Sequence, residues 1–512
     1  MQKYILTSSL LVAAAYAALP QMQLTKNSAP RGRTLQRRSP LAKRGGTDGI
    51  GISEHFDVGG GGGYLATISV GTSDPPQQQQ VLIDTGSGDT FVLGNDYCAS
   101  FASICGGGSF DPSKSTTYIT VAASPAFNIS FVDGTKEYGP YVMDSMTIGG
   151  LEGDRRRVRF SAKWDSSTGG TTYPNLPEVL KDSGAINSRL YSIYLDESTD
   201  NGNVLFGGLD TSKFSGDLVT LDLVPAPGGS TIEAFGVAIT AISVTNSGLT
   251  RSVFTNDSST NGGQQVAQPA LSASLIVGAA GLYLPQAYYQ QIKTSAFGFL
   301  DGADTCSCDH RADDITLQVE FAASVTIVVP ARNLIVPLFN STGSPEKYGN
   351  GTAQCELMIF SDTTDSFFYV GEAILRSMYV VFDLDNAQVS VAQAIINSTA
   401  PSAIQIVAAG PNGVADAASR VQTTSPNTYS IAPLASTGVT YSYSSILTST
   451  TSTSTTATQT PTQTHTQTPV SVSGAAISSA TASAAASGRT GVANSVLTHL
   501  FGQGLMLSVL LF

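Results

Sequence analysis

The sequence Asp84-Thr85-Gly86-Ser87 lies between two short apolar segments, Val81–Ile83 and Phe91–Leu93. Apolar runs of this length, bounded by turn residues, are typical of buried strands. Asp and Gly are residues that tight turns favour. The pattern therefore predicts a strand, a sharp turn that carries a carboxylate, and a second strand. It places that carboxylate at the base of a cleft.

Short apolar segments alternate with turn residues from the Gly-rich segment Gly59–Gly63 to about Ala394. Examples are Tyr64–Val70, Val204–Phe206 and Val325–Val329. Strand-sized runs with little helical periodicity indicate a mostly β protein. Helices are expected only near Leu176–Lys181 and Pro285–Thr294.

The first 44 residues differ in composition from the rest of the chain. Residues 1–17 combine Lys3, an apolar stretch too short for a bilayer and the small-x-small sequence Ala15–Ala17, which predicts a secretory signal peptide. Residues 1–44 hold eight of the 26 Lys and Arg residues and no acid, leaving 18 basic residues against 38 acidic ones. We interpret residues 18–44 as a basic propeptide removed after the dibasic pair Lys43 and Arg44; the alternative is a flexible basic tail. The acidic remainder would repel phosphate, so nucleic acid is excluded as a partner.

The C-terminal part of the chain is rich in Ser and Thr. Between Tyr441 and Val470, 18 of 30 residues are Ser or Thr, with no charged residue. Such a segment cannot bury enough apolar surface to offset its ordering entropy. Residues 398–487 are therefore predicted to be a disordered, O-glycosylated stalk.

The last residues, 488–512, fit a GPI-anchor signal. Small residues at Ser487 and Gly488 precede a polar spacer and an apolar terminus, Leu505–Phe512. A transmembrane helix is disfavoured because this tail is short and contains His499 and Gln503. The expected location is outside the cell, with a GPI anchor at the plasma membrane or in the cell wall as the only link to a membrane.

Glycosylation sequons and cysteines agree with export. The five Asn-x-Ser/Thr sequons are at Asn128, Asn256, Asn340, Asn350 and Asn397. Five cysteines in an exported chain are expected to form bridges rather than a metal site, and an odd number leaves one thiol.

Seven segments resemble the pepsin family of aspartic proteases. Tyr64–Gly71 followed by Asp84–Ser87 resembles the opening of that family. The other similar segments are Phe110–Tyr118, Tyr173–Pro177, Val204–Asp210, Phe214–Leu218 and Gly371–Asp383. Together they span about residues 60–395 and are most similar to the GPI-anchored fungal, yapsin-like branch.

The resemblance implies an all-β, bilobal double-β-barrel fold with a cleft between an N-terminal lobe (residues 45–220) and a C-terminal lobe (residues 221–397). It implies a monomer that needs no cofactor and no metal, with a peptide or protein ligand in the cleft. It also implies a disulfide between Cys98 and Cys105, and a second one between Cys355 and either Cys306 or Cys308.

Peptide hydrolysis by water without a metal needs an acid and a base on the same carbonyl. As in aspartic proteases, two carboxylates about 3 Å apart share one proton, so that one activates the water and the other protonates the carbonyl oxygen. Asp84 is the first of the two. The family's second motif, Asp-Ser/Thr-Gly-Thr, precedes a Tyr-Leu-Pro that is present here as Tyr283–Pro285. Counting back aligns the motif with Ile276-Val277-Gly278-Ala279, which retains the glycine but has lost the acid and both hydroxyls.

Other positions depart from the family in the same direction. The segment that resembles the substrate-covering flap contains Phe131, Asp133 and Gly134, with Phe131 near the usual Tyr. The Trp that bonds to that Tyr falls at Phe91. The sequence Asp182–Gly184 spells an Asp-Ser-Gly motif but follows a helical stretch about half as far from Asp84 as the second lobe requires, so we do not take it as the second motif.

Three functional hypotheses follow. The first is a secreted, cell-surface homologue of aspartic proteases that is catalytically inactive and binds peptides or proteins, or acts as a wall scaffold. The second is an active aspartic-type endopeptidase working at acidic pH, with another carboxylate such as Asp257 reaching the cleft or with a shifted alignment. The third is an adhesin or wall spacer in which the stalk is the functional part.

Overall fold

A computed structural model describes the protein at residues 48–56, 62–86, 90–100, 105, 107–121, 127–130, 136–148, 157–159, 174–196, 201–226, 230, 232, 234–255, 259–261, 264–266, 270–340, 344–362, 368–417, 421–423 and 508–511. Several predictions concern residues outside these ranges. They are the signal peptide, the propeptide with Lys43 and Arg44, the Ser/Thr-rich segment beyond residue 423, the anchor-site residues Ser487 and Gly488, Ser87, the flap residues Phe131, Asp133 and Gly134, the sequon at Asn256, and the alternative acid Asp257.

The largest sheet has 13 strands. Its main path is β29 (Val421–Thr423), β12 (Phe214–Asp222), β27 (Gln388–Ala394), β26 (Met378–Asp383), β9 (Leu190–Asp196), β10 (Asn201–Phe206), β1 (Asp48–Phe56), β2 (Gly62–Val70), β3 (Gln77–Asp84) and β30 (Ser508–Leu511). Beside this path, β2 pairs with β7 (Tyr141–Ile148), which also pairs with β4 (Ile119–Val121) and β8 (Arg157–Arg159).

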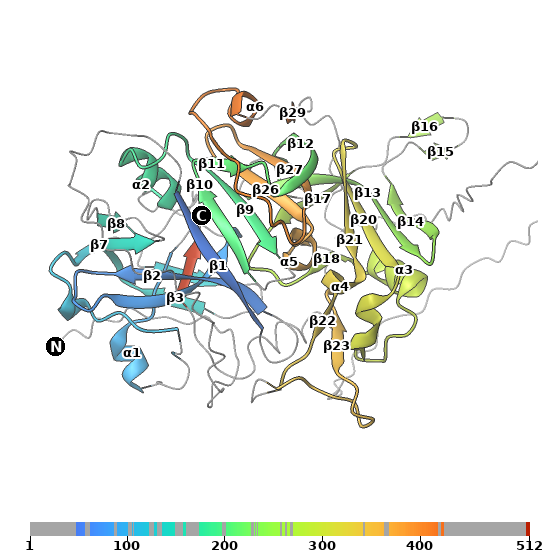
Figure 1. Cartoon of the computed structure of the whole chain (residues 1–512), viewed down its shortest axis with the longest axis horizontal. Helices are drawn as coiled ribbons and strands as arrows, with labels where there is room; N and C mark the ends of the chain where they lie inside the picture. Colours follow the sequence, from blue (N-terminus) through green and yellow to red (C-terminus); the bar gives the residue numbers. More distant parts are fainter. Residues whose placement is uncertain are drawn as a thin grey trace, which may run out of the picture.

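A second sheet of eight strands forms the other side of the molecule (Figure 1). Its path is β21 (Val325–Pro330), β20 (Ile315–Phe321), β13 (Gly236–Asn246), β17 (Leu271–Leu275), β25 (Tyr369–Val370), β18 (Leu282–Pro285) and β24 (Ile359–Asp362), with β14 (Leu249–Thr255) on β13. The smaller sheets pair β5 (Phe127–Ser130) with β6 (Lys136–Gly139), β11 (Gly208–Asp210) with β28 (Ile404–Ile406), β15 (Ser259–Asn261) with β16 (Gln264–Val266), and β23 (Gln354–Leu357) with both β19 (Thr305–Ser307) and β22 (Ile335–Pro337).

The described helices are short. They are α1 (Asn95–Ser100), α2 (Leu176–Asp182), α3 (Gln286–Ala296), α4 (Ala331–Leu334), α5 (Glu372–Leu375) and α6 (Val414–Ala417), with 3-10 turns η2 (Pro112–Lys114) and η3 (Cys308–Ala312). The mostly β class is therefore confirmed, and α2 and α3 lie where the sequence predicts helices. α2 begins where Asn175 caps it by accepting a hydrogen bond from the Glu178 N–H at 3.0 Å. Among the described residues, no helix is both long enough and apolar enough to cross a membrane.

Strands of both predicted lobes share the large sheet. β26, from the predicted C-terminal lobe, pairs with β9, and β27 pairs with β12. Figure 1 shows these strands in the middle of the molecule, with β2 and β3 on one side and β13 and β20 on the other. The two halves of the chain are thus joined by a continuous sheet rather than by a single linker.

An aromatic cluster packs against this shared sheet. The rings of Tyr191 on β9 and Phe382 on β26 stack with centroids 4.9 Å apart, and Phe235 meets Phe382 edge-on at 4.6 Å. Each such pair contributes about 0.5–1.5 kcal/mol beyond the burial of its area. The cluster therefore stabilises the region in which both halves of the chain meet.

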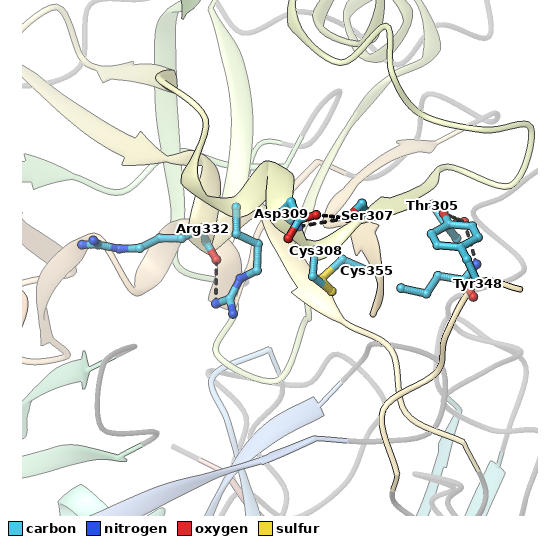
Figure 2. The surroundings of a disulfide bond; sticks show 9 residues. Thr305, Ser307, Cys308, Asp309, Arg332, Tyr348 and Cys355 are labelled. Carbon is cyan, nitrogen blue, oxygen red and sulfur yellow. Dashed lines mark hydrogen bonds between the residues drawn. A yellow bond between two sulfur atoms is a disulfide. The ribbon is translucent and has the colours of Figure 1, made fainter. Parts of the chain in front are cut away.

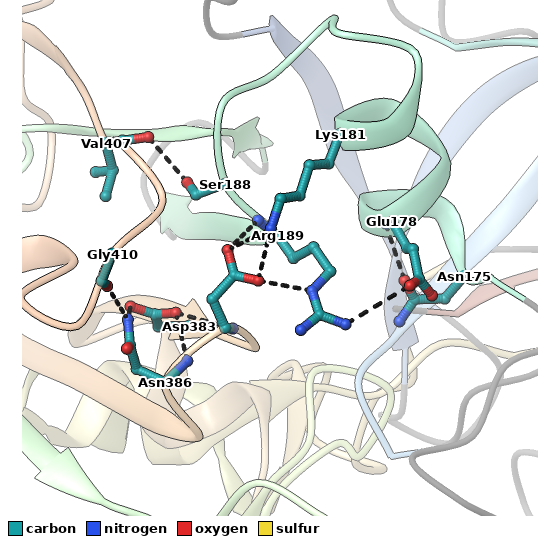
Figure 3. Close-up of polar contacts among 10 residues, drawn as sticks. Asn175, Glu178, Lys181, Ser188, Arg189, Asp383, Asn386, Val407 and Gly410 are labelled. Atoms are coloured by element: carbon teal, nitrogen blue, oxygen red, sulfur yellow. Dashed lines mark hydrogen bonds and ion pairs between the residues drawn. The ribbon is translucent and has the colours of Figure 1, made fainter.

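The predicted start of the stalk at residue 398 needs correction. β28, α6 and β29 all lie within residues 404–423, and Val407 and Val414 are buried in a hydrophobic cluster with the large sheet. Ser188 donates a hydrogen bond to the Val407 carbonyl at 2.9 Å, and Asn386 donates to Gly410 at 3.0 Å (Figure 3). The boundary followed the Ser/Thr-rich composition further along the chain and overlooked the largely apolar run Ala403–Ala409, whose pairing partner β11 lies far away in the sequence.

A carboxylate fixes the neighbouring loop. Asp385 accepts hydrogen bonds from the Lys181 ammonium at 3.0 Å, and from Arg189 through both its N–H at 2.9 Å and its Nε at 2.7 Å. Figure 3 shows Lys181 and Arg189 converging on this point. The contacts join α2 to the turn that follows β26.

Both predicted disulfides are present. Cys98 bonds to Cys105, and Cys355 bonds to Cys308 (Figure 2). Cys306 is the buried free thiol, although it lies directly opposite Cys355 in the pairing of β19 with β23. Burial, reinforced by Asp301 and Asp313, raises the pKa of the Cys306 thiol to about 12, so the thiol stays protonated and inert at physiological pH.

Candidate active site

β3 delivers Asp84 to the floor of the site. Val81 and Ile83 are fully buried, so the alternation of a strand turns Leu82 and Asp84 to the opposite, half-buried side. The strand ends at Asp84, and its Oδ1 accepts a hydrogen bond from the Gly86 N–H at 2.7 Å. This bond closes the predicted Asp-Thr-Gly turn and fixes the carboxylate.

β17 delivers Ile276 in the same way from the other half of the chain. Leu275, its last residue, is fully buried, and the next residue, Ile276, is half-buried. The Ile276 N–H donates to the Val370 carbonyl at 3.0 Å, and the Ile276 carbonyl accepts from the Ala279 N–H at 3.2 Å. Strand β17 is therefore followed by a turn, as β3 is.

Thr85 joins the two turns. Its hydroxyl donates to the Leu275 carbonyl at 2.9 Å and accepts from the Val277 N–H at 3.1 Å. These two backbone groups flank Ile276, and Thr85 is only 4% exposed. A buried hydroxyl with both bonds made holds the second turn in a fixed position against the first.

The glycines of the two turns occupy reciprocal positions. A Cβ added at Gly278 would lie 2.8 Å from Asp84 Oδ1, and one added at Gly86 would lie 3.0 Å from Ile276 Cγ2. Each glycine thus faces the first residue of the opposite turn. Asp84 and Ile276 are related positions, and a larger residue at Gly278 would collide with the Asp84 carboxylate.

The structure thus brings together Asp84, Thr85 and Gly86 with the four residues that the sequence aligned with the second motif. Val277, the counterpart of Thr85, is buried and has no hydroxyl to return the link. The Ala279 carbonyl accepts a bond from the Glu372 N–H at 2.7 Å. The site has one carboxylate turn and one hydrocarbon turn in a common framework.

Comparison with known proteins identifies this framework. The family model "Eukaryotic aspartyl protease" matches residues 63–394. The chain belongs to this family. Over 381 residues it is 31% identical to the probable aspartic-type endopeptidase OPSB of Arthroderma benhamiae, covering 69% of this chain and 73% of that protein. It is 28% identical to aspartic proteinase yapsin-3 of Saccharomyces cerevisiae, covering 67% and 70%. A solved aspartic proteinase from Irpex lacteus has 15% identity and a TM-score of 0.49, covering 69% of this chain and 99% of that one.

Membership of the aspartyl protease family implies a substrate-binding cleft between two lobes. The charge of Asp84 helps to raise the pKa of two tyrosines near this site. Burial, with smaller contributions from Asp362 and Asp84, raises the pKa of Tyr369 to about 12. Burial, and then the charge of Asp84, raises the pKa of Tyr191 well above its ordinary value. Both phenols therefore stay neutral and bring no charge to the site.

Sequence reasoning missed one buried acid, Glu372, whose backbone N–H bonds to the second turn. Glu372 is 1% exposed and begins α5, and its Oε2 lies 3.7 Å from Nη2 of the buried Arg376. Gly371 allows this approach, because a Cβ there would clash with the carbonyls of Ala279 and Gly281. The sequence places Glu372 within Gly371–Asp383, a segment that the resemblance already included.

The remaining predicted site residues are peripheral. Among the described sequons, Asn350 and Asn397 are exposed, Asn340 is half-buried, and Asn128 lies on β5. Within the described ranges, no group of three or more His, Cys, Asp or Glu side chains could hold a metal ion.

Proposed function

We propose that this member of the aspartyl protease family is secreted, displayed on the cell surface, and binds peptide or protein segments in its cleft without hydrolysing them efficiently. The observation that supports it is Ile276, which faces the same floor as Asp84 from the reciprocal position. A branched hydrocarbon can neither give nor accept a proton. Asp84 alone can supply one of the two protonation roles.

The expected loss in the rate of peptide hydrolysis is large. Removing a positioned acid or base costs roughly 10²–10⁴ in rate, and loss from a coupled pair should lie near the upper end. The neighbouring changes are consistent with this loss. Val277 and Ala279 are apolar as well, and the Thr85 hydroxyl is satisfied by backbone groups, so the substitution does not leave the Thr85 hydroxyl without partners.

The location is part of the proposal. A signal peptide at residues 1–17, cleavage after Arg44, a Ser/Thr-rich stalk and an anchor attached near Ser487 and Gly488 would display the folded part outside the cell. Attachment of the anchor would also remove the tail that carries β30. The cationic leader and the Ser/Thr-rich segment Tyr441–Val470, which has no charged residue, support this order. The folded part would act as a monomeric receptor or wall scaffold.

Turnover measurements test the proposal. The secreted protein, the single variant Ile276→Asp and the triple variant with Val277→Thr and Ala279→Thr would be assayed from pH 3 to 6 on unfolded casein and a fluorogenic peptide library. We expect no turnover from the parent protein and measurable turnover from the triple variant. Pepstatin-sensitive turnover by the parent, abolished by Asp84→Ala, would contradict the proposal.

A second candidate is an active aspartic-type endopeptidase at acidic pH. This candidate needs a second acid, and the residue that would have to supply it is Glu372, whose backbone N–H bonds to the Ala279 carbonyl of the second turn. If the parent protein does cleave peptides, the variant Glu372→Gln tests whether Glu372 or another carboxylate is the second acid. A loss of activity in that variant would assign the role to Glu372, whereas unchanged activity would leave Asp84 with a different partner.

A further inference from the structure

We propose that the floor of the cleft selects an unreacted, apolar peptide and rejects a tetrahedral analogue of the hydrolysis transition state. This inference rests on the proposed function and names the ligand of the same site. An active member of such a family must do the opposite, because catalysis requires the transition state to be bound more tightly than the substrate.

The first step is the asymmetry of the floor. On one side, the Asp84 carboxylate is half-buried and held by the Gly86 N–H. On the other, the methyl groups of the half-buried Ile276 cover Gly86, with Cγ2 and Cδ1 at 3.0 and 3.3 Å from the position of a Cβ there. A ligand atom placed between the turns has a polar partner on one side and hydrocarbon on the other.

A planar peptide bond suits such a floor. Its carbonyl oxygen or its N–H can pair with Asp84, depending on whether that carboxyl carries a proton. Its other face needs no hydrogen bond and can contact Ile276. Because Ile276 is partly exposed, an apolar ligand side chain beside this bond removes further hydrocarbon from water.

A tetrahedral analogue does not suit it. Such an inhibitor places a hydroxyl between the two turns, where a pair of acids would normally bond to it from both sides. Here one side of the hydroxyl is pressed against Ile276. A buried polar group left without a partner weakens binding by roughly 5- to 150-fold. True transition-state binders prefer the analogue by 10²-fold or more.

Calorimetry with two probes tests the inference. The first probe is pepstatin, whose central statine carries the hydroxyl. The second is the same peptide with Leu-Gly in place of that statine. Both would be titrated into the secreted protein at pH 4.5, with mass spectrometry of each sample to detect cleavage. We expect the parent protein to bind the peptide more tightly than pepstatin, because the pepstatin hydroxyl loses one of its partners at Ile276.

Two variants provide matched controls. Ile276→Leu keeps a hydrocarbon of equal size and should keep the parent ratio, whereas Ile276→Asp should shift the ratio toward pepstatin by at least tenfold. A parent preference for pepstatin over the peptide, or no binding of either probe, would overturn the inference. Cleavage of the peptide by the parent would instead contradict the proposed function, so the two failures are distinguishable. The parent ratio decides the question even if Ile276→Asp does not fold.

Discussion

Replacing Glu356 by Gln is expected to stabilise the protein at neutral pH and to change its stability little at pH 4. Glu356 lies on β23, is 3% exposed, and its Oε2 has no hydrogen-bond partner among the described residues. Burial raises the pKa of this carboxyl from its ordinary value of 4.5 to about 8. A charged carboxylate in that position would be unfavourable, so the folded protein holds the proton.

The sign and size follow from proton linkage. Between pH 4.5 and about 8, the folded state keeps the Glu356 proton and the unfolded chain has lost it, so the free energy of unfolding falls as pH rises. Each pH unit in this window costs about 1.4 kcal/mol, which gives a loss on the order of 3 kcal/mol by pH 7. Glutamine has no proton to lose and keeps a similar shape. The parent and the variant should therefore differ little at pH 4 and diverge steadily above pH 5.

Urea unfolding of both proteins at pH 4, 5.5 and 7 measures this difference. A useful control is Glu320→Gln, because Glu320 lies on β20, is half-buried and accepts a hydrogen bond from Thr240 at 2.8 Å. The same exchange of Glu for Gln at an acid with a hydrogen-bond partner measures what the amide itself contributes, and the effect of Glu356 is the difference between the two variants. A gap between Glu356→Gln and the parent that is the same at all three pH values would refute the reasoning, because it would mean that Glu356 ionises alike in both states.

Two further substitutions test the contacts that hold the site and the shared sheet. Thr85→Val removes both bonds across the turns and leaves the Leu275 carbonyl and the Val277 N–H without this partner. We expect it to lower the free energy of unfolding, measured in urea, by about 2–4 kcal/mol. Thr85→Ser keeps the hydroxyl and should lose much less. A Ser variant as unstable as the Val variant would mean that the methyl group, not the hydroxyl, matters. Burial raises the pKa of Asp385, but hydrogen bonds from Arg189 and Lys181 outweigh it, so the pKa lies below its ordinary value. The stability that Asp385 contributes is therefore present above the ordinary carboxyl pKa and is lost as pH falls through the lowered value. Asp385→Asn should therefore cost about 1–3 kcal/mol at pH 6 and less at pH 3, and an equal loss at both would show that charge is not involved.

The features that the sequence predicted well are local. The turn at Asp84 is predictable because its turn residues and flanking apolar runs are contiguous, and α2 is predictable because Asn175 and the following Pro mark its start. The alignment of the second motif with Ile276 also depends on nearby residues, because it rests on the short spacing to Tyr283–Pro285. Each of these depends on neighbours within about ten residues.

The features that were missed depend on distant pairing. Nothing near β26 indicates that it pairs with β9, which lies almost 190 residues earlier. The spacing of two residues between Cys306 and Cys308 does not show which thiol reaches Cys355. The sequence does not reveal the contact of Glu372 with the second turn, because that contact forms only after β17, β25 and β18 assemble.

The contacts that shape the floor of the site do not depend on an acid at position 276. Thr85 bonds only to the backbone of the second turn, so those contacts form whichever side chain stands at position 276. The reciprocal packing of Gly86 and Gly278 is likewise independent of the second acid. A cleft can therefore persist after hydrolysis is lost. For the same reason, an acid restored at Ile276 alone would enter a correct framework without neighbouring hydroxyls, since Val277 and Ala279 cannot bond to it. We expect the triple variant to be more active than the single one, and equal activities would show that the acid alone was missing.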